Sequence, residues 1–245
     1  SNQTRVIDAQ KIGAQAPGVP VGRLPDGDAL WSELASPSPG ATNGPALERP
    51  IVINEIHYHP LSDDDADEFV ELFNRGGAPV DVGGWRFVDG IDLTFPAGTV
   101  IPPQGFLVAA KDMAHLMAVQ PQLNPGNTVG NYSGTLANSG ERIALAMPVT
   151  WLVTNGPAIT TNTAHVVVDE VTYGDGGRWG QWSDRGGSSL ELIDPRADNR
   201  LSPNWADSDE TAKAPWTTIE FTGPLDNGRG TLDEVQAMIL GTGEA

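Results

Sequence analysis

Short runs of alternating hydrophobic and polar residues recur from residue 51 onward. Alternation with a period of two predicts half-buried β-strands, because successive side chains of a strand point to opposite faces of a sheet. The clearest runs are "IVINEIHY" (51–58), "EFVELF" (68–73), "VDVGGWRFVD" (80–89), "ERIALAM" (141–147) and "HVVVDEVTY" (165–173). Between them stand the turn-forming stretches "NRGG", "VDGID", "PPQG" and "NSGE". About seven short strands joined by such turns predict an all-β sandwich or barrel.

Helical periodicity is confined to two short stretches. "KDMAHLMAVQ" (111–120) is followed at once by Pro121, which cannot continue a helix, and "TLDEVQAMIL" (231–240) lies near the end of the sequence. We therefore expect helices only as short insertions in a β-fold.

The first 46 residues differ from the rest of the chain in having many turn-forming residues and few alternating runs. "LPDG" (24–27) reads as a turn, and "SPSPGATNGP" (36–45) is a linker rich in turn formers. "VIDAQKIG" at 6–13 also echoes "VVDEVTYG" at 167–174, with Val, Asp and Gly in the same places. These features predict that residues 1–46 are the end of a preceding module plus a linker, as in a tandem array.

Charge excludes two classes of partner. The chain has 32 acidic and 14 basic residues, a formal net charge of −18, and no cluster of Lys and Arg. Such a surface repels nucleic acid and anionic membranes, so neither is expected as a partner. There is no cysteine, which excludes disulfides and thiolate metal sites, and no apolar run long enough for membrane insertion.

The acidic stretch "SDDDADE" (62–68) is the first candidate site. It lacks the residue order of an EF-hand loop. An irregular Ca²⁺ site built from Asp63, Asp64, Asp65 and Asp67 is one interpretation. The alternative is a solvated loop, since a run of charges is usually a surface feature.

Other side chains suggest chemistry less strongly. Glu55 and Glu71 on neighbouring strands could act as an acid–base pair, but nothing else in the sequence builds a sugar-binding cleft. His57 and His59 lack the third ligand that zinc requires. Three tryptophans in Gly-, Ser- and Asp-rich loops could instead stack on a sugar or anchor a protein, or they could cap the open end of a sandwich; these are Trp179, Trp182 and Trp205.

Several ordered motifs together resemble the lamin-tail domain family of the bacterial type. They are "IVINEI" (51–56), "EFVELFN" (68–74) followed by "VDVGGW" (80–85), "TFPAGTVIPPQGF" (94–106) and "GERIAL" (140–145). The resemblance covers residues 47–212, with an insertion at 148–165. The segment 213–245 is similar to the start of a jelly-roll module, cut off before that module is complete.

The resemblance implies an immunoglobulin-like β-sandwich that is not an enzyme and has no cofactor. It implies an interaction or scaffold module of a larger exported bacterial protein, secreted or at the cell surface. Its expected partners are neighbouring domains of the same polypeptide and an extracellular protein or glycan. A ligand-binding module for carbohydrate or Ca²⁺ is the alternative.

Overall fold

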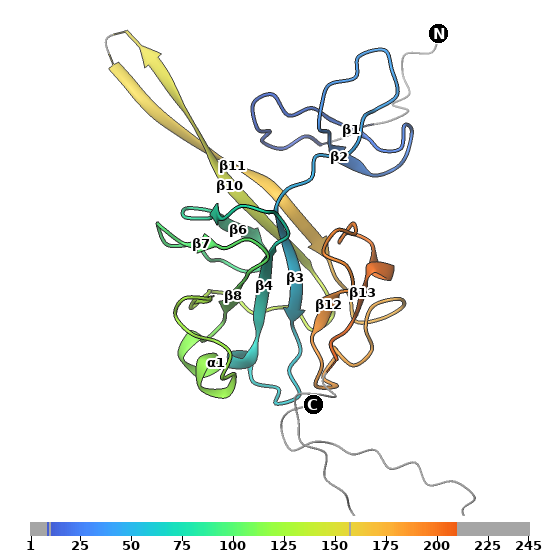
Figure 1. Cartoon of the computed structure of the whole chain (residues 1–245), viewed down its shortest axis with the longest axis vertical. Helices are drawn as coiled ribbons and strands as arrows, with labels where there is room; N and C mark the ends of the chain where they lie inside the picture. Colours follow the sequence, from blue (N-terminus) through green and yellow to red (C-terminus); the bar gives the residue numbers. More distant parts are fainter. Residues whose placement is uncertain (1–8, 10, 157, 210–245) are drawn as a thin grey trace, which may run out of the picture.

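Two facing β-sheets form the body of the molecule, as the ribbon in Figure 1 shows. This computed structural model describes residue 9 and residues 11–156 and 158–209. The larger sheet has the strand order β13 (Trp205–Asp207), β12 (Leu190–Leu192), β3 (Ile51–His57), β4 (Phe69–Asn74), β8 (Phe106–Ala110) and β9 (Thr128–Val129). Its neighbours pair antiparallel except β8 and β9, which are parallel.

The smaller sheet has the order β11 (Ala158–Thr172), β10 (Arg142–Asn155) and β6 (Arg86–Asp89). Two further pairs are short: β5 (Val80–Asp81) with β7 (Val100–Ile101), and β1 (Val21–Arg23) with β2 (Trp31–Glu33). The described residues also contain two 3₁₀ turns, η1 (Asp65–Asp67) and η2 (Ser202–Asn204). The prediction of an all-β, immunoglobulin-like sandwich is confirmed.

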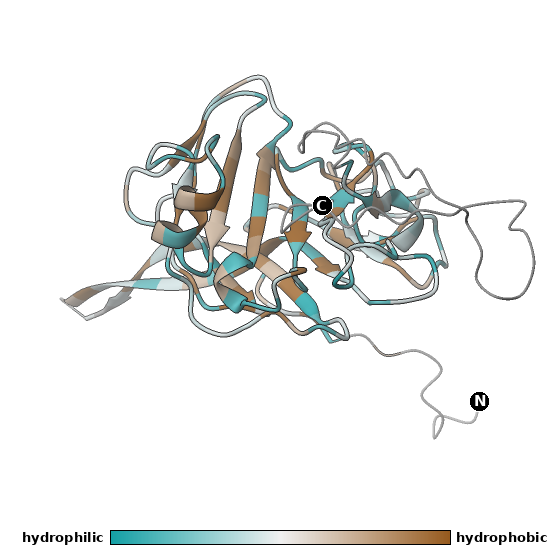
Figure 2. Ribbon diagram, turned by 90° about the horizontal axis from the view of Figure 1, so that it is seen from below, coloured by the Kyte–Doolittle hydropathy of each residue, from teal (hydrophilic) through white to brown (hydrophobic). Residues whose placement is uncertain are grey.

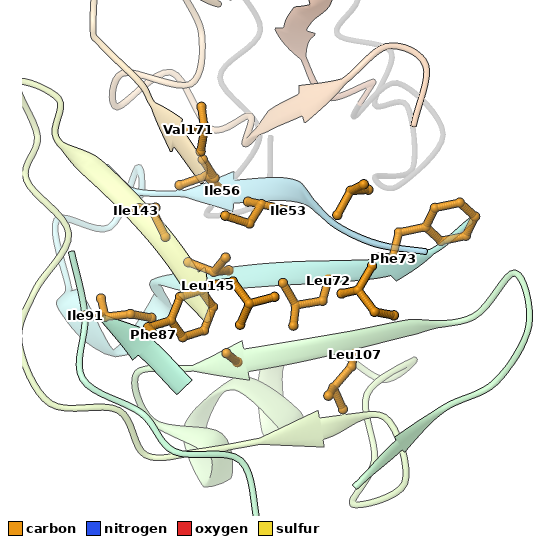
Figure 3. Close-up of a cluster of buried hydrophobic side chains, with 14 of the residues drawn as sticks. Ile53, Ile56, Leu72, Phe73, Phe87, Ile91, Leu107, Ile143, Leu145 and Val171 are labelled. Atoms are coloured by element: carbon orange, nitrogen blue, oxygen red, sulfur yellow. The ribbon is translucent and has the colours of Figure 1, made fainter. Parts of the chain in front are cut away.

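The core lies between the two sheets (Figure 3). Ile53, Ile56 and Leu72 face it from the larger sheet, and Ile143 and Leu145 face it from the smaller one; all five are fully buried. Ile143 and Leu145 are inward positions of one alternating run, whereas Ile53 and Ile56 share a face because of the β-bulge between Ile53 and Glu55. Hydrophobic burial of these side chains drives the two sheets together. Figure 2 shows the same division, with hydrophobic residues gathered on the strands and hydrophilic ones in most connecting loops.

A second, smaller cluster lies on the outer face of the larger sheet. The helix α1 (Met113–Val119) covers this face, and Asp112 caps it by accepting a hydrogen bond from the His115 N–H at 3.0 Å. Leu116 packs there against Phe69, Val108 and Ala110. The helix predicted at 111–120 is therefore present, whereas the one predicted at 231–240 lies outside the described residues. No helix in the described part of the chain is long and apolar enough to span a membrane.

The segment that precedes the sandwich packs against it. Its β1–β2 hairpin turns at Pro25–Gly27, where Gly27 takes a φ of +82° and the Asp28 N–H donates to the Pro25 carbonyl at 3.0 Å. Two arginines join this hairpin to the sandwich. Arg49 Nη2 lies 2.7 Å from Glu33 Oε2, and Arg200 Nη1 donates to the Trp31 carbonyl at 2.7 Å.

The strands β10 and β11 continue together well beyond the sandwich. Their pairing runs from Arg142 opposite Thr172 out to Asn155 opposite Ala158. The outer half of this hairpin, where Pro148 faces His165 and the strands run on to the turn, projects away from the body in Figure 1. It corresponds to the insertion expected at 148–165, and we call it the arm.

Candidate functional site

The predicted acidic loop joins β3 to β4 at one end of the sandwich. Its carboxylates make separate contacts rather than converging on one point. Asp64 accepts from the Ala66 N–H at 2.9 Å and caps the turn η1, while Asp67 lies 2.8 Å from Nε2 of His115. Asp65 lies 3.4 Å from the hydroxyl of Thr135. The hydrogen bond with Asp67 raises the pKa of His115, which favours the charged imidazolium.

The fourth aspartate ties this loop to a second one. Asp63 accepts from Arg185 Nη2 at 2.9 Å, and Asp184 lies 2.6 Å from Nδ1 of His59. Arg185 also donates its backbone N–H to the His59 carbonyl. The β3–β4 loop and the β11–β12 loop (residues 173–189) therefore form one continuous edge, which we call the loop rim.

Metal binding at the loop rim stays a prediction. In residues 11–156 and 158–209, no three His, Asp or Glu side chains gather where they could hold an ion. A Ca²⁺ ion needs six to eight oxygen ligands, so Asp63, Asp64, Asp65 and Asp67 would have to exchange their present partners for the metal.

The three candidate tryptophans have different surroundings. Trp205 is only 3% exposed, and its indole Nε1 donates to the Asn199 carbonyl at 2.7 Å. Trp179 is half-buried and packs on Trp205, with ring centroids 6.2 Å apart. These two rings cap the end of the sandwich core, which was the alternative to ligand binding. Trp205 has no free face for a ligand. Trp182 is 54% exposed and presents its ring at the loop rim.

Asp207 holds Trp182 in place, and sequence reasoning missed it. Its Oδ1 accepts from the backbone N–H groups of Trp182 at 2.8 Å and Ser183 at 2.7 Å, and its Oδ2 accepts from Gln181 at 3.0 Å. Gly180 makes this possible, because a Cβ there would lie 2.3 Å from Oδ1 of Asp207. In the sequence, the two residues are an aspartate at the end of one strand and a glycine within a distant loop, and no local pattern links them.

Glu68 ends the acidic stretch but points inward. Its side chain is 1% exposed, and its Oε2 accepts from the Tyr132 hydroxyl at 2.9 Å and from the Leu136 N–H at 3.0 Å. Burial raises the pKa of this carboxyl to about 7, because charge is costly to hold away from water, although both donors oppose the rise. The carboxyl fastens the segment around Leu136 to the start of β4.

Glu55 and Glu71 are directly opposite one another on β3 and β4. Glu71 accepts from the Asn54 amide at 3.0 Å, and Glu55 accepts from the Ser189 hydroxyl. Glu71 is thus hydrogen-bonded to the neighbouring strand and Glu55 to the residue that precedes β12, which is the structural alternative to an acid–base pair.

A cleft of about 530 Å³ lies on the other side of the molecule, between residues 11–48 and the sandwich, and neither Glu55 nor Glu71 lines it. Six basic residues line it: Lys11, Arg49, Arg75, Arg142, Arg196 and Arg200. Carboxylates are interleaved with them, including Glu33, Asp169, Glu170 and Asp198. We call this surface the arginine seam.

The contacts across the arginine seam are mostly to backbone carbonyls and single carboxylates. Arg75 donates to the carbonyls of Arg49 and Pro195, each at 2.9 Å. Arg200 forms a two-pronged pair with Asp198, with both N–O distances 2.8 Å, and it also reaches the Trp31 carbonyl. The planar guanidinium suits such several-partner contacts, so the arginine seam acts as a joint between two segments of the chain.

Comparison with known proteins identifies one family. The lamin tail domain family matches residues 45–175, which is more than half of the chain. No curated protein and no solved structure gave a match. The matched residues run from just before β3 into the β11–β12 loop, and so include the cross-strand carboxylates, the acidic loop and the arm. The ordered motifs, the facing sheets and this match agree: the chain belongs to the lamin tail domain family, whose members are immunoglobulin-like and generally non-enzymatic.

Proposed function

We propose that the chain is a non-catalytic interaction and scaffold module of a larger exported polypeptide. The observation that supports this most is the arginine seam, where Arg49 and Arg200 hold a neighbouring segment against the sandwich. A module of this kind fixes the direction in which the preceding part of the chain leaves it. Secretion or display at the cell surface, with an extracellular protein or glycan as partner, belongs to the same proposal.

Replacing both arginines tests the scaffold role. The double variant Arg49→Ala, Arg200→Ala loses the Glu33 and Trp31 contacts while the core stays intact. We expect limited proteolysis to cut between residues 11 and 46 at least tenfold faster than in the wild type, with the sandwich surviving as a resistant fragment. The matched control is Arg178→Ala, an exposed arginine that does not line the arginine seam. Equal cleavage rates in all three proteins would contradict a scaffold role for the seam.

The absence of catalysis is part of the proposal and has its own test. A broad hydrolase screen of the purified chain is expected to give no turnover above the buffer rate. Turnover that disappears in Glu55→Gln or Glu71→Gln, while the fold is retained, would establish an enzyme instead.

A ligand-binding module is the second candidate, and one observation favours it. Trp182 is exposed on the loop rim, which also carries Asp63 and Asp184, and Asp207 accepts a hydrogen bond from its backbone N–H. An aromatic face next to carboxylates is a common way to bind a sugar ring, which offers both apolar C–H groups and hydroxyl donors. Ca²⁺ at the loop rim is the other ligand in this reading.

Thermal melts with Ca²⁺, with EDTA and with a panel of glycans separate the two candidates, because a ligand of the native state raises Tm. A glycan that raises Tm for the wild type but not for Trp182→Ala would support binding at the loop rim. Trp151→Ala is the matched control, since Trp151 is 46% exposed but lies on the arm. If neither Ca²⁺ nor any glycan moves Tm, the ligand-binding candidate fails.

A further inference from the structure

The arm is a two-stranded ribbon in which each strand pairs only with the other. Beyond Pro148 and His165, in the part of the chain that the structure describes, neither strand pairs with a third one. A two-stranded hairpin alone is marginally stable in water, and three or more strands are usually needed. The arm is therefore built in a way that favours the addition of further strands.

Its side chains are apolar on both faces. Leu152 lies opposite Thr161 and Ile159 lies opposite Thr154, so both project from one face; they are 68% and 66% exposed. Trp151, 46% exposed, projects from the other face. Neither face of the ribbon is packed on the sandwich core, so these groups gain from any partner that removes them from water.

The free edge of β11 carries none of the usual protection. Proteins blunt exposed strand edges with lysine, proline, charged residues or bulges. From Ala158 to His165 the sequence is "AITTNTAH", which contains no Lys, Arg, Asp, Glu or Pro and is rich in β-branched residues. Such a strand is well suited to form backbone hydrogen bonds with another strand.

The distribution of charge favours a second copy of the chain as the occupant. All 32 acidic and 14 basic residues lie outside residues 148–165, in a chain whose net charge is −18. A basic partner finds no carboxylate on the arm, while the net charge of −18 makes the bodies of two copies repel one another. The arm is the place where a second copy can approach without like-charge repulsion.

We propose that the arm is a self-association surface, on which the β11 edge of one chain pairs with the β11 edge of a second copy. An antiparallel pairing of identical strands obeys a two-fold axis, so the contact is self-complementary and closes as a dimer with a four-stranded ribbon. This contact does not use the arginines of the arginine seam or the side chains of the loop rim, so it does not depend on the functions proposed for them above.

Sedimentation of the full chain over a concentration series tests the proposal. The wild type is expected to move from 25.9 kDa toward twice that mass as concentration rises. Added salt should tighten the dimer, because it screens repulsion between the acidic bodies and weakens no ion pair on the arm. A chain that stays monomeric at every concentration and salt level would overturn the proposal.

Variants locate the contact. Ile159→Lys is expected to weaken the dimer at least tenfold, because a lysine on an exposed edge strand opposes pairing with another strand. Ile193→Lys is the matched control, since Ile193 is 65% exposed but lies away from the arm, and it should change the dissociation constant less than twofold.

In a shortened chain, residues 148–165 are replaced by an Asn-Gly turn between Met147 and Val166, which face each other. This chain should be monomeric and keep its β-sheet spectrum. Association that survives the shortening, or that responds to Ile193→Lys instead, would refute the contact.

Disulfide trapping gives a second readout, which is clean because the chain has no cysteine. Single cysteines are placed in turn from Ile159 to Thr163, with Ile193→Cys as the control. At least one arm position should give a covalent dimer under mild oxidation at a rate well above the control. If every arm position reacts no faster than Ile193→Cys, the pairing does not form.

Discussion

Glu68→Gln is expected to remove a pH-dependent part of the free energy of unfolding. Burial raises the pKa of Glu68 from 4.5 to about 7 in the folded protein, whereas in the unfolded chain it returns to its ordinary value. Below pH 4.5 the carboxyl is protonated in both states and costs nothing. As the pH rises to about 7, the unfolded chain loses this proton first, so the wild type becomes progressively less stable. Glutamine, which resembles the protonated acid, has no such dependence.

The difference in pKa sets the magnitude. About 2.5 pH units at about 1.4 kcal/mol each give roughly 3 kcal/mol. The free energy of unfolding of Glu68→Gln minus that of the wild type should therefore rise by about 3 kcal/mol between pH 4 and pH 8. The absolute offset between the two proteins is set by how well the amide meets Tyr132 and Leu136, and it does not affect this change.

Urea unfolding at a series of pH values measures the difference directly. Asp169, whose pKa burial also raises to about 7, is present in both proteins and cancels in the subtraction. Glu48→Gln is the control, because Glu48 is exposed, and it should stay within about 0.5 kcal/mol of the wild type throughout. A Glu68→Gln difference that is the same at every pH would refute the reasoning.

Three further substitutions test the core, a turn and the loop rim. Leu145→Ala empties a fully buried site between the two sheets and should lower the free energy of unfolding by about 2–5 kcal/mol in urea denaturation. Gly140→Ala should cost about 3 kcal/mol or more, because Gly140 has a φ of +98° and a Cβ there would lie 2.4 Å from the Tyr173 carbonyl oxygen; an unchanged melting temperature would contradict this. Asp207→Ala leaves three backbone N–H groups without their acceptor and should cost about 2 kcal/mol, with faster amide exchange at residues 181–183. Slow exchange there would show that the loop does not depend on Asp207.

The sequence predicts the sandwich because strands and turns are specified by patterns within a few neighbouring residues. Alternation places Val70 and Leu72 on one face of β4, and the turn formers between runs set where strands end. Strict alternation would put Ile53 and Ile56 on opposite faces of β3, and the β-bulge between Ile53 and Glu55 is what brings both into the core. The helix at Met113–Val119 is equally local, since Asp112 is a good N-cap and Pro121 a stop. Phe69 is an informative exception. Phe69 is hydrophobic and buried, but it is buried under α1 instead of between the sheets. It directly precedes Val70 in β4, so its side chain points to the opposite face of the sheet.

The loop rim and the arginine seam depend on contacts between residues far apart in the chain. Trp205 reads as a loop residue because its surroundings are polar, yet it is buried by pairing of β13 with β12 and by contact with Trp179. Likewise, Arg200 and Trp31 are brought together only when the last strands return beside the first segment. No local pattern encodes which distant loop a carboxylate or guanidinium will meet, so sequence reasoning finds these residue types but not their partners.

The direction of β3 and β13 determines how the domain responds to a pulling force. Each is antiparallel to β12, so the first and last strands of the sandwich run the same way, and the chain enters at one end of the sheet and leaves at the other. Tension between Ile51 and Asp207 is then directed along the strands and perpendicular to their backbone hydrogen bonds, which must break together instead of one by one. In single-molecule stretching we expect this geometry to unfold at a higher force than a pull that peels the same strands apart one pair at a time.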